Sequence, residues 1–320
     1  MRTKIYLLAI IASLMFTGCE KSPTQHEPQV IDVSHFTIQN YPRVDGSTSA
    51  HPLQNVIACY TLGINFEWYD APDGTRRIYP DYSDTSKKEI RDYIIDTIQH
   101  HGTHEAYVNL INDSTDVILV ARSPSEDEMA LANSMGVSLN LKAVALDAFV
   151  FILNVNNPVD NLTLDQIRGI YTGNITNWRE VGGPNAAISA YQREPNSGSQ
   201  ELMEALVMKG LKMVNAPDMV LVTMISIINK VELDPWSIGY TVYYYEEFMA
   251  MREAIKLCGV NGIPPNYDTI FHRRYELTAP VYAVIRSNLD KTSNAYLLWQ
   301  WMTTAIGQQV VALSGYIPAK

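Results

Sequence analysis

The sequence predicts an α/β fold, because short apolar stretches typical of strands alternate with stretches of helical periodicity along most of the chain. The stretches 116–121 and 148–153 are the most apolar of the expected strands. Loops rich in glycine and serine stand where an expected strand ends and an expected helix begins, as at 45–50 and 193–199. This arrangement indicates largely parallel sheets, in which ligands bind at the carboxyl ends of the strands. With 320 residues, the chain is long enough for two domains.

The N-terminal residues have the features of a secretory signal. Arg2 and Lys4 precede an apolar run that is too short to span a membrane as a permanent helix. The sequence Phe-Thr-Gly-Cys that ends at Cys19 resembles a bacterial lipobox, although Phe replaces the usual aliphatic residue. The resemblance implies removal of residues 1–18 and a lipid on Cys19 that anchors the exported protein to a bacterial membrane, in the periplasm or at the cell surface. Residues 19–34 are expected to form a polar tether.

The charge and the cysteines exclude several classes of protein. The formal net charge is −10, and cleavage of the signal would make it more negative, which argues against a nucleic-acid binder. An anion site must therefore work through local donors. Cys59 and Cys258 could pair in an exported protein, but we favour two separate core residues, because they fall in different expected parts of the fold. No cysteine pattern indicates a metal site, and no cofactor is implied.

The stretch around Arg193 has the composition of an anion-binding loop. The planar guanidinium of Arg193 can bind two oxygen atoms at once. Ser197, Gly198 and Ser199 add hydroxyl and backbone N–H donors where a helix over about 200–209 is expected to begin. An ordinary capped helix with a surface arginine is the alternative interpretation.

Two further loops place hydroxyl groups at expected helix starts. Their candidate donors are Ser47, Thr48, Ser49 and Ala50 before a helix with Pro52 in its first turn, and Thr103, interpreted as the N-cap of the next helix but one. Each loop alone is more simply a helix cap, but together with the Arg193 stretch they indicate one oxyanion site. The neighbouring His100, His101 and His104 are interpreted as exposed loop residues, with no metal site.

The remaining stretches complete the alternation of strands and helices. Helices are expected over 87–98, 125–135, 164–171 and 294–313, and strands over two stretches within 139–154 and over 187–191, 236–245 and 275–285. Residues 65–90 mix aspartate, proline, glycine and tyrosine, and are interpreted as a surface excursion without a regular element.

Taken together, several of these stretches resemble the phosphate-binding lipoprotein (PstS-like) family of phosphate ABC importers. The matching stretches are Asp45–Ser49, Asn174–Trp178, Arg193–Ser199, Ser237–Tyr240, Tyr275–Tyr282 and Ala305–Pro318, in order along the chain. The resemblance implies a two-lobe periplasmic-binding-protein clamp of the class II type, each lobe a mostly parallel sheet flanked by helices. Lobe 1 is expected over 35–145 plus 281–320, and lobe 2 over 146–280. The implied protein is a monomer, not an enzyme, that captures inorganic phosphate between the lobes for an ABC permease.

The resemblance also assigns roles to individual residues. Arg193 matches the phosphate-clamping arginine, and the donors at Ser47–Ala50, Thr103 and Ser197–Ser199 match the loops that hold the anion. One departure concerns Arg122 and Ser123, which stand where the family has an aspartate that accepts the proton of hydrogenphosphate and so rejects sulfate.

Arg122 has no acceptor for that proton. Either Asp45 or Glu194 replaces the aspartate, or the selectivity is looser and extends to another oxyanion or a phosphorylated small molecule. Arg122 can also simply point to solvent. A phosphoester hydrolase with Ser197 or Ser199 as nucleophile is the enzymatic alternative, although the chain has no GxSxG motif.

Overall fold

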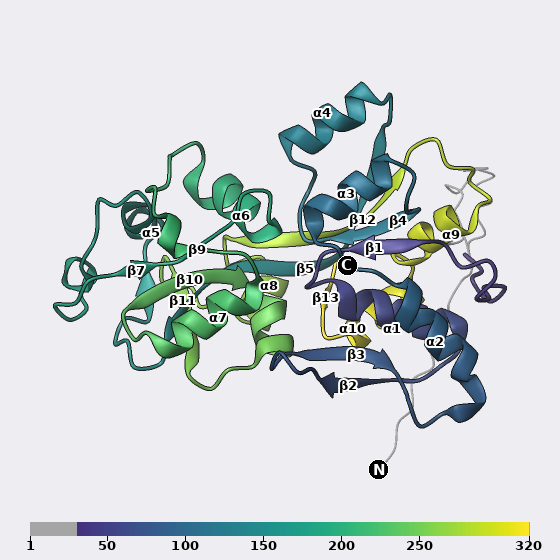
Figure 1. Cartoon of the computed structure of the whole chain (residues 1–320), viewed down its shortest axis with the longest axis horizontal. Helices are drawn as coiled ribbons and strands as arrows, with labels where there is room; N and C mark the ends of the chain where they lie inside the picture. The colour runs from purple at the N-terminus through teal and green to yellow at the C-terminus, as the bar shows by residue number, and fades with distance from the viewer. Residues whose placement is uncertain (1–30, 320) are drawn as a thin grey trace, which may run out of the picture. The chain divides into compact units, whose positions relative to one another are not determined.

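The computed structural model describes residues 31–319, which Figure 1 draws in colour. The predicted signal peptide, its Cys19 and most of the predicted tether lie outside the described residues. Val33 is already buried, so the packed chain begins before the predicted end of the tether at Ser34. Within the described range, none of the helices has the length and apolar character needed to cross a membrane.

Helices and strands alternate along the described chain, which confirms the predicted α/β class. The α-helices are α1 (His51–Leu62), α2 (Lys88–Thr97), α3 (Thr103–Ile111), α4 (Glu126–Ser134), α5 (Leu164–Tyr171), α6 (Gly198–Leu202), α7 (Met224–Leu233), α8 (Tyr267–Phe271), α9 (Asn294–Trp301) and α10 (Ala305–Leu313). The strands are β1 (Val44–Gly46), β2 (Phe66–Asp70), β3 (Arg76–Pro80), β4 (Val117–Val120), β5 (Leu139–Asn154), β6 (Asn161–Leu162), β7 (Ser189–Ala190), β8 (Gln192–Arg193), β9 (Val220–Leu221), β10 (Ser237–Val242), β11 (Ile255–Val260), β12 (Thr278–Arg286) and β13 (Ile317–Pro318). Two π-helical segments follow α6 and β10, namely η3 (Met203–Met208) and η5 (Tyr245–Ala250).

The main sheet is organised around β5, which is one strand of 16 residues where the sequence predicted two stretches. The strand order is β1-β4-β12-β5-β10-β7, and β11 and β13 also pair with β5. The pairs β1–β4 and β10–β7 are parallel, but every partner of β5 runs antiparallel to it. The prediction of largely parallel sheets was therefore wrong, and the sheet is mixed. Alternation of helices and strands does not fix strand direction when β5 pairs with strands that lie far along the chain.

Helices cover the sheet along its whole length, as Figure 1 shows. Helix α3 packs on β1 and β4, α7 packs on β10, and α9 and α10 pack on β12 and β5. The core beneath them is apolar. All residues of β5 from Val144 to Leu153 are buried, and Asp147 is the one charged residue among them. Cys59 and Cys258 are both buried and unpaired, as the favoured interpretation expects.

Strand β5 changes partners close to Asp147. Ala148 is opposite Thr278 of β12, whereas Phe149 is opposite Val242 of β10. The predicted boundary between the lobes, at 145/146, falls just before this change. The division into two lobes remains a prediction, and β5 and β12 would be the strands that cross between them.

Asp147 is a buried carboxyl group at this change of partners. Its Oδ1 accepts hydrogen bonds from the backbone N–H of Ala148 (2.8 Å) and of Tyr244 (3.0 Å). Its Oδ2 has no hydrogen-bond partner among the described residues. Burial raises the pKa of Asp147 to about 7, although the two N–H donors act in the opposite direction. The fold therefore favours the protonated carboxyl group.

The variant Asp147→Asn is expected to flatten the pH dependence of stability between about pH 4 and pH 7. The folded-state pKa lies above the unfolded value of about 3.9, so the wild type loses stability as the pH rises through this window. At about 1.4 kcal/mol per pKa unit, the unfolding free energy of the variant should exceed that of the wild type by a few kcal/mol more above pH 7 than at pH 4. Urea denaturation at several pH values measures this difference. Asp218→Asn removes an exposed carboxylate and is the control. A difference from wild type that does not change with pH would contradict the assignment.

The structure differs from the sequence prediction over residues 65–90, where β2 and β3 form an antiparallel hairpin. The hairpin packs on α1, with Ile78 fully buried. Asp73-Gly74 between two aromatic-rich runs is a hairpin signal that could have predicted it, and Gly74 has the positive φ of 77° that such a turn requires. This segment is therefore an ordered part of the fold.

The predicted C-terminal helix over 294–313 is two helices, α9 and α10. Helix α9 ends at Trp301, and Thr304 begins α10 by accepting a hydrogen bond at Oγ1 from the N–H of Gly307 (3.1 Å). A Cβ atom at Gly307 would lie 2.2 Å from the carbonyl oxygen of Trp301. The close approach of the two helices at this glycine is what breaks the periodic stretch.

Candidate functional site

Three loops that the sequence singled out line one cavity of about 640 Å³, referred to below as the main cavity. The predicted site residues on its wall are Ser47, Thr48 and Ser49, Thr103, and Arg193, Ser197, Gly198 and Ser199. A Cβ atom at Gly198 would lie only 2.7 Å from the Oγ1 of Thr103, so the second and third loops are in direct contact. The glycine is required there because a side chain would push these two loops apart.

The first loop follows β1 and is held by its own hydrogen bonds. The N–H of Ser47 donates to the carbonyl of Leu119 in β4 (2.9 Å), and the N–H of Ala50 donates to Ser47 Oγ (3.3 Å). Ser47 and Ser49 are buried, and their hydroxyl oxygens lie 3.4 Å apart. Ala50 is the N-cap residue of α1 and does not line the main cavity.

The second loop begins α3 and is held by Asp45. The Asp45 carboxylate accepts hydrogen bonds from the N–H of His101 (3.0 Å), from Asn109 Nδ2 (2.8 Å) and from the N–H of Gly46 (2.7 Å), and it also contacts His101 Nδ1 (2.9 Å). Gly102, with a φ of 95°, is the N-cap of α3, and Thr103 is its first residue, one position from the prediction.

These contacts argue against Asp45 as the acceptor that replaces the family aspartate. Its two oxygen atoms are already engaged within the protein, and it does not line the main cavity. Of the two carboxylates considered as substitutes for the family aspartate, Glu194 is the one on the cavity wall.

Arg193 ends the short strand β8 and is buried against β9. Its side chain donates from Nε to the carbonyl of Leu221 (3.0 Å) and from Nη2 to the carbonyl of Val222 (2.7 Å). Its backbone N–H donates to the hydroxyl of Tyr240 (2.9 Å). No carboxylate within residues 31–319 forms an ion pair with it, and burial lowers the pKa of Arg193.

The other two buried arginines among residues 31–319, Arg122 and Arg286, are each paired with a carboxylate. Arg122 donates from Nη1 and Nη2 to the two oxygens of Glu128, both at 2.8 Å, and Arg286 lies 2.7 Å from a carboxylate oxygen of Asp113. Burial alone would lower the pKa of Arg122, but the hydrogen bonds and charge of Glu128 raise it. Among the buried arginines in the described part of the chain, Arg193 alone has no such partner. A buried cation is costly unless an anion accompanies it, so the main cavity is suited to an anion.

The structure does not bring Arg122 and Ser123 into the main cavity. They line a second cavity of about 710 Å³. Arg122 is only 6% exposed, so the alternative that it points to solvent was wrong, while its predicted role in ligand binding stays a prediction. The capping interaction of Glu128 at the start of α4 accounts for this, because it directs the carboxylate towards the guanidinium.

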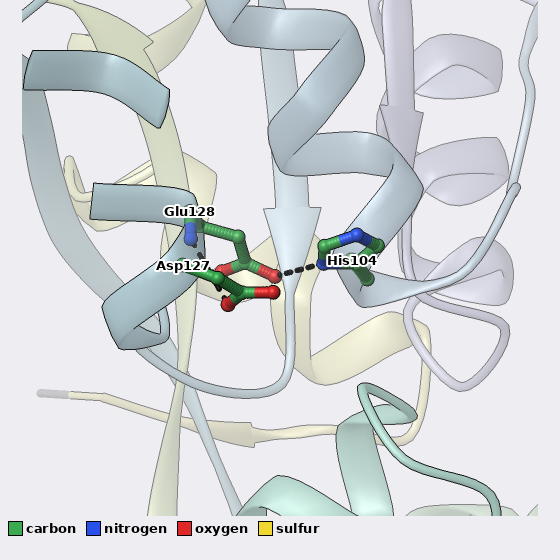
Figure 2. Close-up of side chains that lie close together, drawn as sticks. All are labelled: His104, Asp127 and Glu128. Atoms are coloured by element: carbon green, nitrogen blue, oxygen red, sulfur yellow. Dashed lines mark hydrogen bonds and ion pairs between the residues drawn. The ribbon is translucent and has the colours of Figure 1, made fainter. Parts of the chain in front are cut away.

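The histidines near the second loop do not form a common site. His100 packs against His51, with ring centroids 4.3 Å apart, and His101 contacts Asp45. His104 lies with Asp127 and Glu128, and potential ligand atoms of the three residues lie within 4.8 Å of one another (Figure 2).

The Glu128 carboxylate of this cluster already has a positively charged partner, Arg122. The Glu128 carboxylate accepts two hydrogen bonds from Arg122, and the N–H of Ser125 donates to the same carboxylate at 2.8 Å. A metal ion there would have to displace the guanidinium. We therefore assign the cluster a structural role, joining the starts of α3 and α4.

Sequence reasoning missed the residues that the β2–β3 hairpin and the second half of the chain contribute to the main cavity. They are Asp73, Thr75 and Arg77 from the hairpin, Thr223, Met224 and Ile225 at the start of α7, and Val242, Tyr245 and Met249 from β10 and η5. The hairpin turn could have been found from Asp73-Gly74. No local sequence pattern could have predicted that the hairpin packs against η5, which lies more than 160 residues away in sequence.

Comparison with known proteins adds a family and a set of relatives. A family model described as a PBP superfamily domain matches residues 85–303. The phosphate-binding protein PstS of Borreliella burgdorferi is 26% identical over 182 residues, which is 55% of this chain and 64% of that protein. PstS of Staphylococcus saprophyticus is 26% identical over 223 residues, 66% of this chain and 67% of that protein. The chain thus spans less than two thirds of the Borreliella relative.

Solved structures show the same fold. A protein of Clostridium perfringens, described as a putative phosphate ABC transporter substrate-binding protein with bound phosphate, matches with a TM-score of 0.64 and 24% identity over 88% of this chain and 100% of its own. An ABC-type phosphate transport receptor of Vibrio cholerae matches with a TM-score of 0.58 and 21% identity over 86% and 98%. At these identities the likeness concerns the fold.

Proposed function

Because the chain belongs to the PBP superfamily, we propose that it captures inorganic phosphate in the main cavity and delivers it to an ABC permease. The phosphate-binding names of its relatives support the ligand, as does the fold that the chain shares with a solved protein described with bound phosphate. The protein acts as a binding component and catalyses no reaction of its own.

The observation that carries this proposal is the buried guanidinium of Arg193, which lacks a carboxylate partner among the described residues. Phosphate supplies the missing negative charge and can accept two hydrogen bonds from one guanidinium. The hydroxyl groups of Ser197 and Ser199, and those of the loops at Ser47–Ser49 and Thr103, are the further donors on the same wall. Such donors replace the hydration that the anion loses on entering.

We also propose that the cavity lies between two lobes, 35–145 plus 281–320 and 146–280. Ser47–Ser49 and Thr103 would then belong to one lobe, and Arg193 with Ser197–Ser199 to the other. An anion that touches both sets of donors binds the closed arrangement more tightly than the open one, and so shifts the population towards closure.

We further propose that the chain is exported, that a lipid on Cys19 anchors it to the membrane, and that it acts as a monomer. The lipid would keep the protein beside its permease after removal of residues 1–18. A radiolabelled-palmitate test on the wild-type chain and on Cys19→Ala would detect the lipid directly.

Selectivity is proposed to depend on Glu194. It is the residue next to Arg193, it lines the main cavity, and its position allows it to accept the proton of hydrogenphosphate. Sulfate has no proton to donate at neutral pH and would meet a repelling carboxylate.

Calorimetric titration of the phosphate-stripped protein with phosphate, and separately with sulfate, tests the function. We expect heat that saturates at one phosphate per chain, and no competition from excess sulfate. Competition from sulfate would show that Glu194 does not discriminate between the anions. Absence of phosphate binding, by heat and by thermal shift, would contradict the proposed function.

The hydrolase alternative has little support in the site. Within residues 31–319 no hydrogen bond joins a histidine to Ser197 or Ser199, and Ser197 Oγ accepts the N–H of Gln200 (3.2 Å) as a helix cap. A serine nucleophile needs an adjacent base. Turnover of a chromogenic phosphate ester that is lost in Ser199→Ala would restore this alternative.

A further inference from the structure

The β2–β3 hairpin forms a part of the main cavity that the family match does not include. The family model begins at residue 85, whereas the hairpin spans 66–80. Its turn places Asp73, Thr75 and Arg77 on the cavity wall. These side chains therefore belong to the site without belonging to the matched domain.

The hairpin turn holds these side chains in fixed positions. Asp73 Oδ1 accepts hydrogen bonds from the N–H (3.0 Å) and the Oγ1 (2.6 Å) of Thr75, which is only 2% exposed. Arg77 Nη2 donates to the other carboxylate oxygen of Asp73 at 2.7 Å. Asp73 thus orients Arg77 through one of its five N–H groups, and Tyr79 is a second side-chain hydrogen-bond partner of Arg77.

The hairpin also closes against the second half of the chain. Arg76 Nη1 donates to Met251 Sδ at 3.2 Å, just after η5. A Cβ atom at Gly74 would lie 2.5 Å from Nη2 of Arg252, so the Arg252 side chain packs against the hairpin turn. Arg77 from the hairpin and Tyr245 from η5 line the same cavity as Arg193.

The cavity has room for more than a tetrahedral anion, and its hairpin side carries polar side chains that the anion site around Arg193 does not include. Beside the donors around Arg193, the wall carries apolar side chains, among them Met224, Val242 and Met249. The volume of about 640 Å³ lies in the range of roughly 300–1,000 Å³ that is typical of small-molecule sites, and most of the lining residues are polar or charged. A ligand that carries hydroxyl groups beside its phosphoryl group could also bind the polar side chains of the hairpin, Asp73, Thr75 and Arg77.

We propose that the cavity also binds phosphomonoesters of small polyols, with the phosphoryl group at Arg193 and a hydroxyl group of the polyol at Arg77. This inference rests on the proposed function, because it uses the same anion site for the phosphoryl group. Arg77 is then a specificity-determining residue: it acts on the organic part of the ligand and leaves inorganic phosphate unaffected.

Titration of the phosphate-stripped protein with glycerol 3-phosphate and with inorganic phosphate tests this inference. Arg77→Met removes the guanidinium and keeps most of the apolar stem. It should weaken glycerol 3-phosphate about tenfold or more, the usual effect of losing a hydrogen bond to a charged group, and change phosphate affinity less than twofold. Arg179→Met is the matched control, since Arg179 is exposed and does not line the cavity. It should change neither affinity, and thermal melts of both variants report on folding.

The possible results separate the two proposals. Phosphate binding without glycerol 3-phosphate binding overturns the inference and leaves the proposed function intact. Binding of glycerol 3-phosphate alone supports the inference and overturns capture of inorganic phosphate. Equal affinity of wild type and Arg77→Met for the ester, with both folded, overturns the role of Arg77. Failure of both ligands to bind overturns both proposals.

Discussion

Arg193→Ala is expected to weaken phosphate binding by at least about 100-fold. Removing one partner of a buried, hydrogen-bonded charge pair costs roughly 3–5 kcal/mol, and 1.4 kcal/mol is a factor of ten in affinity. The phosphate would remain in a partly desolvated cavity with only neutral donors around it. Calorimetric titration of the purified variant measures the loss.

The same variant should fold without phosphate. It removes a buried cation that has no carboxylate partner in the described chain, which offsets the loss of two hydrogen bonds to the carbonyls of Leu221 and Val222. Thermal unfolding of the ligand-free protein separates the two effects. Arg179→Ala, at an exposed arginine away from the main cavity, is the control and should bind as wild type does. Phosphate affinity of Arg193→Ala within a few-fold of wild type would contradict the site.

Glu128→Leu is expected to destabilise the protein by roughly 3–5 kcal/mol, because it leaves the Arg122 guanidinium buried without a counter-charge. Glu128 is fully buried and also holds His104 and the N–H of Ser125, so three elements lose a partner at once. Urea denaturation of the phosphate-free protein measures the change in unfolding free energy.

A second change tests the reason for this loss. Combining Glu128→Leu with Arg122→Met replaces the ion pair by apolar side chains of similar volume, and such replacements are often close to neutral. The double variant should therefore recover the part of the stability that is lost to the unpaired arginine, while the contacts of Glu128 with His104 and the N–H of Ser125 stay lost. Glu126→Gln, in the same turn of α4 but exposed, should lie close to wild type. A double variant as unstable as Glu128→Leu would show that the cost does not come from the unpaired arginine.

The sequence predicted the parts of the fold that depend on local pattern. The apolar run at 116–121 is β4, Pro52 is in the first turn of α1, and Gly173 directly follows the end of α5 and its cap. Strand direction was wrong, because the antiparallel partners of β5 come from β10, β11 and β12, and no local pattern records such long-range pairing.

The candidate site was likewise predictable only where local sequence pattern determines it. Ser47, Thr103 and Arg193 each stand in a loop of recognisable composition, and the structure brings all three to one cavity. Arg122 also stands at the end of a strand, but its side chain turns to Glu128, six residues later. The sequence contains both residues, yet only the packing of α4 shows that they pair. Arg77 reaches the cavity through a hairpin whose position depends on contacts with η5.

A crystal structure of the protein grown with phosphate would test the central claim most directly. We predict density for one tetrahedral anion in the main cavity, within about 3 Å of the Arg193 guanidinium, the usual distance of a charge-assisted hydrogen bond. The hydroxyl groups of Ser197 or Ser199 should contact the same anion. Phosphate bound in the second cavity beside Arg122, with the main cavity holding only water, would contradict the account.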